Sequence, residues 1–162
     1  MTEASGNEYF ASAVGEVNVV AKMKEVNAVI GGEGNGGIIY PTSHYGRDAL
    51  VGIALFLTHL AQSGTKTSLL KGSYPNYTIS KNKIQLEEGM DVDGILRDIQ
   101  GEFSNNEIDT TDGVKIYFEK EWVHLRKSNT EPIVRIYAEG STQSVADSLA
   151  NKIKQDIKEM IS

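Results

Sequence analysis

Residues 28–41 have the sequence AVIGGEGNGGIIYP, in which five glycines within residues 31–37 separate two short apolar runs. The apolar runs Ala28–Ile30 and Ile38–Tyr40 are typical of short buried strands. Pro41 stops the second run, because proline cannot donate a backbone hydrogen bond. This stretch therefore predicts a strand, a glycine-rich loop and a second strand.

The glycine-rich loop also matches a nucleotide-binding pattern. Gly32, Gly34 and Gly37 satisfy G-x-G-x-x-G. That motif binds a pyrophosphate only where a helix starts directly after the glycines, because the amides and dipole of the helix meet the phosphates. A strand-like run follows here, and no Gly-Lys-Ser/Thr of a P-loop is present. We therefore do not expect dinucleotide binding.

Glu33 and Asn35 are the only residues with side chains in this loop. Glycine lets the backbone come close to a ligand, and a carboxylate beside an amide can hydrogen-bond sugar hydroxyls. The alternative is a flexible hairpin, but so many glycines would lose much chain entropy when the loop becomes ordered. We favour a binding loop, with Glu33 and Asn35 as sugar-binding residues.

The segments around the loop indicate helices and a domain boundary. A helix is predicted from Glu16 to about Val26, and a largely buried helix from Arg47 to about Ala61 with Gly64 as its C-terminal cap. Between Thr65 and Asn76 the chain becomes rich in Ser, Thr, Gly and Pro. We place the boundary here and predict domains at residues 1–66 and 67–162.

The second predicted domain alternates between strand and helix patterns. Strands are indicated at Tyr77–Leu86, Val114–Phe118, Trp122–Arg126 and Ile133–Ala138, with a hairpin turn at Asp112-Gly113. One helix is indicated after the capping residue Asp91, and another from about Thr142, with the apolar stripe Val145, Leu149, Ile153, Ile157 and Ile161. These elements predict an α+β domain in which two helices cover one face of a small antiparallel sheet.

A polar segment joins two of these strands. Residues 126–132 are Arg-Lys-Ser-Asn-Thr-Glu-Pro, and Arg135 follows. Arginine binds phosphate oxygens in bidentate fashion, Ser and Thr add neutral donors, and backbone amides of a turn can form a nest. An ordinary polar hairpin with surface arginines explains the composition equally well.

Composition excludes several classes of protein. The 162 residues include no cysteine, which excludes disulfide scaffolds, thiolate metal sites and cysteine nucleophiles. A net charge of −6 argues against wrapping a nucleic acid but leaves a small anionic ligand possible. No apolar run approaches the ~20 residues of a membrane span, and no secretory signal opens the chain. We expect a cytoplasmic protein with neither membrane nor nucleic acid as a partner.

The two loops together resemble the α-D-phosphohexomutase superfamily of phosphoglucomutases, phosphomannomutases and phosphoglucosamine mutases. Residues 31–37 are similar to the sugar-specificity loop of its third domain (G-G-E-x-S-G), and residues 126–132 to the phosphate-binding loop of its fourth (R-x-S-N-T-E-P). Gly46–Leu50 is similar to the segment that follows the sugar loop. The resemblance implies an α/β remnant of domain III at residues 1–66 and a TATA-binding-protein-like α+β domain IV at residues 67–162.

The resemblance also implies what this chain lacks. Full members transfer a phosphoryl group between positions 1 and 6 of a hexose, using a phosphoserine in domain I and a Mg²⁺-binding acidic loop in domain II. No D-G-D-G-D run occurs here, and Ser43 lies in Thr42-Ser43-His44-Tyr45-Gly46, which departs from the family's T-x-S-H-N-P nucleophile loop. We expect no catalytic residue and no metal ligand in this chain, Mg²⁺ only in the full-length enzyme, and no activity of the fragment alone.

Binding roles follow from the same resemblance. The residues implied to hold the non-reacting phosphate are Arg126, Ser128, Asn129, Thr130 and Arg135, while Glu33 and Asn35 would bind sugar hydroxyls. Asn35 stands where the family has serine, so the choice among glucosamine, mannose and glucose phosphates stays open. A stand-alone phosphosugar-binding module is the alternative function. Strands missing from the α/β layer would leave an open sheet edge through which two copies could associate.

Overall fold

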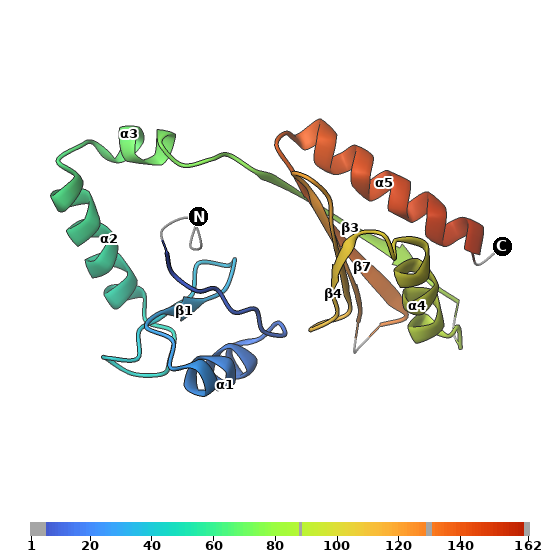
Figure 1. The fold of residues 1–162 in the computed structure, drawn as a ribbon, viewed down its shortest axis with the longest axis horizontal. Helices are drawn as coiled ribbons and strands as arrows, with labels where there is room; N and C mark the ends of the chain where they lie inside the picture. The colour runs from blue at the N-terminus through green and yellow to red at the C-terminus, as the bar shows by residue number, and fades with distance from the viewer. Residues whose placement is uncertain (1–5, 88, 129–130, 161–162) are drawn as a thin grey trace. The chain divides into compact units, whose positions relative to one another are not determined.

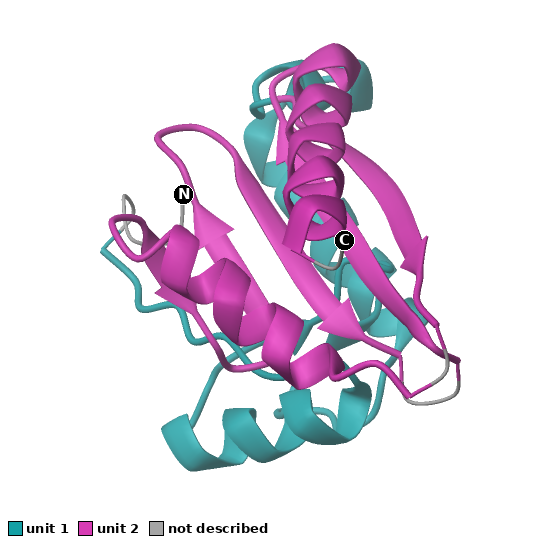
Figure 2. Cartoon of the chain, turned by 90° about the vertical axis from the view of Figure 1, so that its right-hand side faces the viewer, with its two compact units in different colours: residues 1–75 teal, residues 76–162 magenta. Residues whose placement is uncertain are grey.

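The computed structural model describes residues 6–87, 89–128 and 131–160 (Figure 1). The chain divides into two compact units, residues 1–75 and 76–162 (Figure 2). The sequence places the boundary between residues 66 and 67, nine residues before this division. That position is the start of a short helix, residues 67–72, which belongs to the first unit. Among the described residues, no helix has the length and apolar character needed to cross a bilayer.

The first unit has the predicted order of helix, strand, glycine loop, strand and helix. Its elements are α1 (Glu16–Val26), β1 (Gly31–Gly32), β2 (Ile38–Ile39), α2 (Ala49–Ser63) and α3 (Thr67–Gly72). β1 and β2 form an antiparallel hairpin in which Gly31 pairs with Ile39 and Gly32 with Ile38. This topology confirms the α/β class predicted for the first part of the chain.

The first strand lies later than the apolar run that predicted it. Val29 and Ile30 are exposed, and strand pairing begins at Gly31. The side chain of Met23 on α1 occupies the space that a Cβ on Gly31 would need. Only glycine allows this approach, so the hairpin packs on α1 through Gly31 together with the buried Ile39, while Val29 and Ile30 take no part in this cluster.

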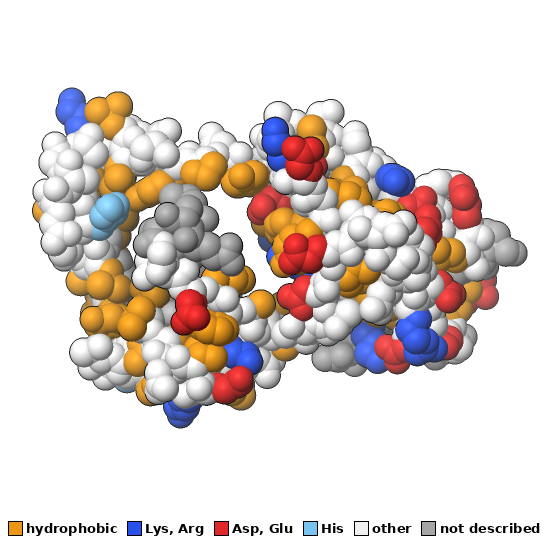
Figure 3. All heavy atoms as spheres, in the orientation of Figure 1, with side chains coloured by type: hydrophobic (Ala, Val, Ile, Leu, Met, Phe, Trp, Pro, Cys, Tyr) orange, Lys and Arg blue, Asp and Glu red, His pale blue; other side chains and the backbone are white. Residues whose placement is uncertain are grey.

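The helix predicted to be largely buried is instead an exposed one. No residue of α2 is buried, and Leu50 is 78% and Ile53 54% exposed. Hydrophobic side chains are visible at the surface around the start of this helix (Figure 3). The prediction of burial was wrong because the first unit has only a two-stranded sheet and the buried cluster Val19, Met23 and Ile39, which is too small to cover α2.

The ends of α2 nevertheless follow the sequence signals. The carboxylate of Asp48 accepts hydrogen bonds from the amides of Leu50 and Val51, at 2.9 and 3.0 Å, and so caps the start of the helix. Gly64 ends it with φ of 61°, a left-handed conformation that favours glycine. The hydrogen bonds from Val51 and from the side chain of His44 lower the pKa of Asp48.

The second unit is a five-stranded antiparallel sheet with the strand order β3-β7-β6-β5-β4. Its strands are β3 (Thr78–Gln85), β4 (Glu107–Asp109), β5 (Val114–Tyr117), β6 (Trp122–Lys127) and β7 (Ile133–Gly140). Its helices, α4 (Val92–Glu102) and α5 (Gln143–Met160), both pack on one face of the sheet. The predicted α+β domain is confirmed.

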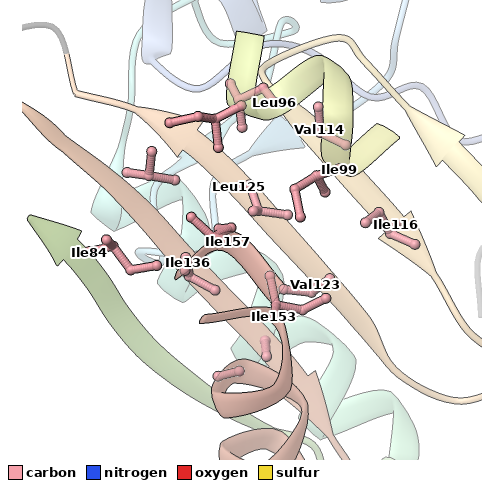
Figure 4. Close-up of a cluster of buried hydrophobic side chains, with 14 of the residues drawn as sticks. Ile84, Leu96, Ile99, Val114, Ile116, Val123, Leu125, Ile136, Ile153 and Ile157 are labelled. Carbon is pink, nitrogen blue, oxygen red and sulfur yellow. The ribbon is translucent and has the colours of Figure 1, made fainter. Parts of the chain in front are cut away.

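The core of this unit lies between the sheet and the two helices (Figure 4). Along β7, the buried residues Val134, Ile136 and Ala138 alternate with partly exposed ones, as a strand with one covered face requires.

The residues of α5 that are buried are Ala146, Ala150, Ile153 and Ile157. Of the predicted apolar stripe, Ile153 and Ile157 are buried as expected, whereas Val145 and Leu149 are only partly buried. Ile161 lies outside the described residues. Alanines face the sheet instead, because their small side chains let α5 approach β7 and β3 closely.

Hydrogen bonds to aspartate carboxylates fix the start of α4 and the turn between β4 and β5. Asp91 caps α4 by accepting from the amide of Gly94 at 2.9 Å. Before the predicted Asp112-Gly113 turn, Asp109 accepts from the amide of Thr111 at 2.8 Å. Hydrogen bonds from the side chain and the backbone of Thr111 lower the pKa of Asp109. Gly113 has φ of 78°, and a Cβ there would collide with the carbonyl oxygen of Leu125.

Truncating a fully buried side chain should destabilise the second unit strongly. For Ile136→Ala we expect the free energy of unfolding to fall by about 3 kcal/mol, because the substitution removes apolar contacts and leaves a cavity. Urea unfolding followed by the fluorescence of Trp122, the only tryptophan of the chain, measures the change. Ile79→Ala, at a position 43% exposed, is the matched control and should cost less than about 1 kcal/mol. Equal losses for the two variants would contradict this placement of the core.

Acid should destabilise the second unit partly through Asp109. Its pKa is lower in the folded chain than the ordinary aspartate value of about 3.9 in the unfolded chain, so the unfolded state takes up its proton first. The stabilisation is present above pH of about 4 and is lost as the pH falls towards the folded pKa. We expect the stability difference between the wild type and Asp109→Asn to shrink between pH 6 and 3 in the same urea assay. A difference that does not change with pH would contradict this role of the carboxylate.

Candidate functional site

The hairpin between β6 and β7 gathers most of the predicted phosphate-binding residues at one end of the sheet. The amide of Ser128 donates to the carbonyl oxygen of Ile133 at 3.0 Å, and the amide of Ile133 donates to that of Glu131 at 2.8 Å. These bonds close the hairpin. Asn129 and Thr130 lie outside the described residues.

Arg126 and Arg135 are directly opposite each other in the hairpin. The register pairs Arg126 of β6 with Arg135 of β7. Their neighbours Leu125 and Val134 are fully buried on the helix-covered face, so both arginines lie on the other face of the sheet. The structure therefore brings together two guanidinium groups that are nine positions apart in the sequence.

A carboxylate holds one of the two arginines. Nη1 of Arg126 lies 3.2 Å from Oδ2 of Asp112, and these side chains are 30% and 25% exposed. Asp112 was predicted only as a turn residue, and its contact with Arg126 was missed. The pairing of β5 with β6, which sets Val114 opposite Leu125, brings the turn beside Arg126. The contact between Asp112 and Arg126 could have been predicted only if the register of β5 and β6 had been known.

Lys127, the next residue, belongs to the other side of the sheet. Its Nζ lies 2.8 Å from both carboxylate oxygens of Asp93 on α4. Because adjacent residues of a strand point to opposite faces, this ion pair ties the strand end to a helix and keeps Lys127 away from the two arginines. Lys127 was assigned no ligand contact from the sequence, and its side chain joins β6 to α4.

Pro132 anchors the base of the hairpin to the neighbouring strand. Its carbonyl oxygen accepts from the amide of Leu86 at 2.9 Å and from Nε2 of Gln85 at 3.3 Å. The end of β3 therefore supports the loop that carries the polar residues.

The glycine-rich loop of the first unit is held by its own hydrogen bonds. The amide of Glu33 donates to the carbonyl oxygen of Gly37 at 3.2 Å, and the amide of Gly36 donates to that of Glu33 at 3.0 Å. A Cβ on Gly32 would collide with the carbonyl oxygen of Gly37. Close approach of the two strands of the hairpin thus requires glycine here.

Both predicted sugar-binding side chains take part in this loop. Oε1 of Glu33 accepts from the amide of Gly15 at 3.1 Å, at the start of α1. Oδ1 of Asn35 accepts from the amide of Gly37 at 2.9 Å. Each of these two side chains therefore uses one oxygen to stabilise the loop. Oε2 of Glu33 and the amide nitrogen of Asn35 have no hydrogen-bond partner among the residues that the structure describes.

An ion pair next to the loop also supports it. Nε of Arg47 lies 2.7 Å from Oε2 of Glu16, and the side chain of Arg47 packs against Gly37. The nearby Ser43 lies in a turn, where its amide donates to the carbonyl oxygen of Tyr40 at 2.9 Å. In the described part of the chain, no three His, Asp or Glu side chains come together as a metal site requires.

Family models match almost the whole chain. The model described as phosphoglucomutase/phosphomannomutase, alpha/beta/alpha domain III, matches residues 1–77. The model described as phosphoglucomutase/phosphomannomutase, C-terminal domain, matches residues 80–155. The two matches follow each other in the order of the two units.

Individual relatives agree with these matches. The chain is 37% identical over 147 residues to a phosphoglucosamine/phosphogalactosamine mutase of Sulfurisphaera tokodaii, covering 90% of this chain and 32% of the relative. It is 36% identical over 148 residues to a phosphoglucomutase/phosphomannomutase of Thermococcus kodakarensis, with coverage of 90% and 32%.

A solved structure shows the same fold. It is a crystal structure of a phosphoglucomutase/phosphomannomutase family protein from Burkholderia thailandensis, with a TM-score of 0.76 and 24% identity, covering 97% of this chain and 34% of that one. The chain thus spans about a third of the length of the proteins it matches. With domain III and the C-terminal domain matched in succession, it belongs to the phosphoglucomutase/phosphomannomutase family, within the α-D-phosphohexomutase superfamily.

Proposed function

We propose that this chain is the phosphosugar-binding part of a phosphohexomutase. The hairpin between β6 and β7 binds the phosphate that does not react, through Arg126, Ser128, Asn129, Thr130 and Arg135. The observation that carries the proposal is the cross-strand pair of Arg126 and Arg135 on the helix-free face of the sheet.

An anion explains this pair of arginines better than folding does. Like charges directly opposite on a sheet destabilise it, so neither guanidinium gains stability from the other. Asp112 compensates only one of them. A phosphate between the two would accept hydrogen bonds from both, in the bidentate geometry that suits guanidinium groups.

The glycine loop supplies the second part of the proposed function. Glu33 and Asn35 are already oriented by bonds to Gly15 and Gly37, so they would lose little side-chain freedom on binding a sugar. The remaining carboxylate oxygen accepts a hydrogen bond from a hydroxyl, and the amide nitrogen donates one. Together they would bind neighbouring hydroxyls of a hexose.

In the full-length protein, these contacts would serve 1,6-phosphoryl transfer. A bisphosphorylated intermediate must be held by one phosphate while the other reacts, in either orientation, and fixed cations lower the entropic cost of that positioning. Mg²⁺ would supply charge stabilisation at the reacting phosphoryl group in the full-length enzyme. The contribution that we propose for this chain is binding and orientation, and we expect it to be inactive alone.

The substrate is proposed from the relatives. Their names include phosphoglucosamine/phosphogalactosamine mutase and phosphoglucomutase/phosphomannomutase. We propose glucosamine phosphate as the first substrate to test, with mannose and glucose phosphates next.

Removing an arginine of the cross-strand pair should weaken phosphate binding. We expect the chain to bind glucosamine 6-phosphate with a dissociation constant on the order of millimolar, because few contacts must offset the entropy of association. Arg126→Ala or Arg135→Ala should weaken binding at least about tenfold, as loss of a charge-assisted hydrogen bond does.

NMR titration of the amides of residues 126–135 measures this effect. Arg97→Ala is the matched control, because Arg97 is an exposed arginine on α4 paired with Asp91. It should bind like the wild type. Shifts confined to another surface of the chain, or full binding by both arginine variants, would refute the phosphate site.

Changing the acidic residue of the glycine loop should affect the sugar and not the phosphate. Glu33→Gln should weaken binding of glucosamine 6-phosphate about threefold to tenfold, while inorganic phosphate should bind as to the wild type. Glu25→Gln, on the exposed surface of α1, is the control. An equal loss for both ligands, or no loss for the sugar phosphate, would contradict the role of Glu33.

A further inference from the structure

A third cation stands in line with the two arginines. The register of β3 and β7 pairs Lys83 with Arg135, and that of β7 and β6 pairs Arg135 with Arg126. Neighbouring positions in such a ladder have Cβ atoms about 5 Å apart, within reach of one small ligand for long side chains. Lys83, Arg135 and Arg126 therefore form one row across three strands, which we call the cation row.

All three members lie on the same face of the sheet. Each member has a strand neighbour that is buried against the helices: Ile84 beside Lys83, Val134 beside Arg135, and Leu125 beside Arg126. Lys83 itself is exposed. Its side chain therefore projects from the helix-free face, on the side that carries the guanidinium groups.

Little negative charge balances the cation row. Arg126 is paired with Asp112, but neither Lys83 nor Arg135 forms an ion pair with any residue that the structure describes. Three positive charges beside one carboxylate leave about two uncompensated. Strands with directly opposed like charges are less stable than strands with neutral or opposite pairs, so folding alone does not explain the row.

We infer that Lys83 is a further phosphate-binding residue, and that the cation row selects a phosphate monoester dianion over a monoanion; the inference rests on the function proposed above. At pH 7 a phosphate monoester carries a charge of about −1.5 to −2, which matches the uncompensated charge of the row. A sulfate ester of the same sugar carries a single negative charge and would leave one cation unpaired. Lys83, as a point charge on a flexible stem, adds charge without demanding a fixed geometry.

Lys81 offers a natural comparison on the same strand. It lies on the same face one pleat away, where the register sets Tyr137 and His124 in line with it and no arginine. Its Nζ lies 5.7 Å from the centroid of the Tyr137 ring. Lys81 therefore has the same charge as Lys83 and lies on the same strand, but its cross-strand neighbours are not arginines.

The test compares two ligands at one pH. Binding of glucose 6-phosphate and glucose 6-sulfate is measured by NMR titration at pH 7.5 for the wild type, Lys83→Met, Lys83→Arg and Lys81→Met. We expect Lys83→Met to weaken binding of the phosphate about tenfold and of the sulfate at most about twofold to threefold, because the dianion loses the charge that neutralised it. Lys83→Arg should retain binding of the phosphate, and Lys81→Met should bind both ligands like the wild type.

The outcomes separate this inference from the function on which it rests. If the wild type binds glucose 6-phosphate through Arg126 but Lys83→Met binds it equally well, Lys83 is not a ligand and only this inference fails. Equal weakening of phosphate and sulfate would refute the selection of the dianion. If the wild type does not bind, or binds independently of both arginines, the proposed function and this inference fail together. Fluorescence of Trp122 and the dispersion of the amide spectrum verify that each variant is folded.

Discussion

The alternation of side chains along β7 is the constraint on which the second unit depends. Val134, Ile136 and Ala138 are fully buried against the helices, so Arg135 and Tyr137 must face the other way. A shift of the register by one residue would bury the arginine and expose the core. The apolar core and the cation row are therefore fixed by the same hydrogen-bonded ladder, and neither could move without the other.

The two units use different means to hold a loop. The hairpin of the second unit continues two strands of a five-stranded sheet, and a carbonyl bonded to the end of β3 supports its base. The glycine loop ends a hairpin of two short strands and depends on contacts from the side chains of Glu33, Asn35 and Arg47. Side chains proposed to bind sugar thus also stabilise the loop that carries them.

Local signals predicted most of the elements, and contacts between distant segments account for what was missed. Asp91, Gly64 and the Asp112-Gly113 turn act within a few residues, and each is found where the sequence indicated. The exposure of α2 could not be predicted, because an apolar helix pattern does not say whether enough sheet exists to cover it. The contact of Asp112 with Arg126 and the alignment of Lys83 with Arg135 depend on strand register, which sequence spacing does not reveal. The residues proposed to bind the ligand remain predictions, with Asn129 and Thr130 outside the described residues.

β3 is the long edge strand of the five-stranded sheet, since only β7 pairs with it. Its outer edge leaves backbone groups exposed, and such edges recruit strands from other chains into aggregates. Lys81 and Lys83 stand on this strand, and charged lysines repel a second copy that approaches in register. A neutral residue at position 83 would thus leave this edge less protected against a second copy, in addition to removing the charge that we propose to bind the ligand.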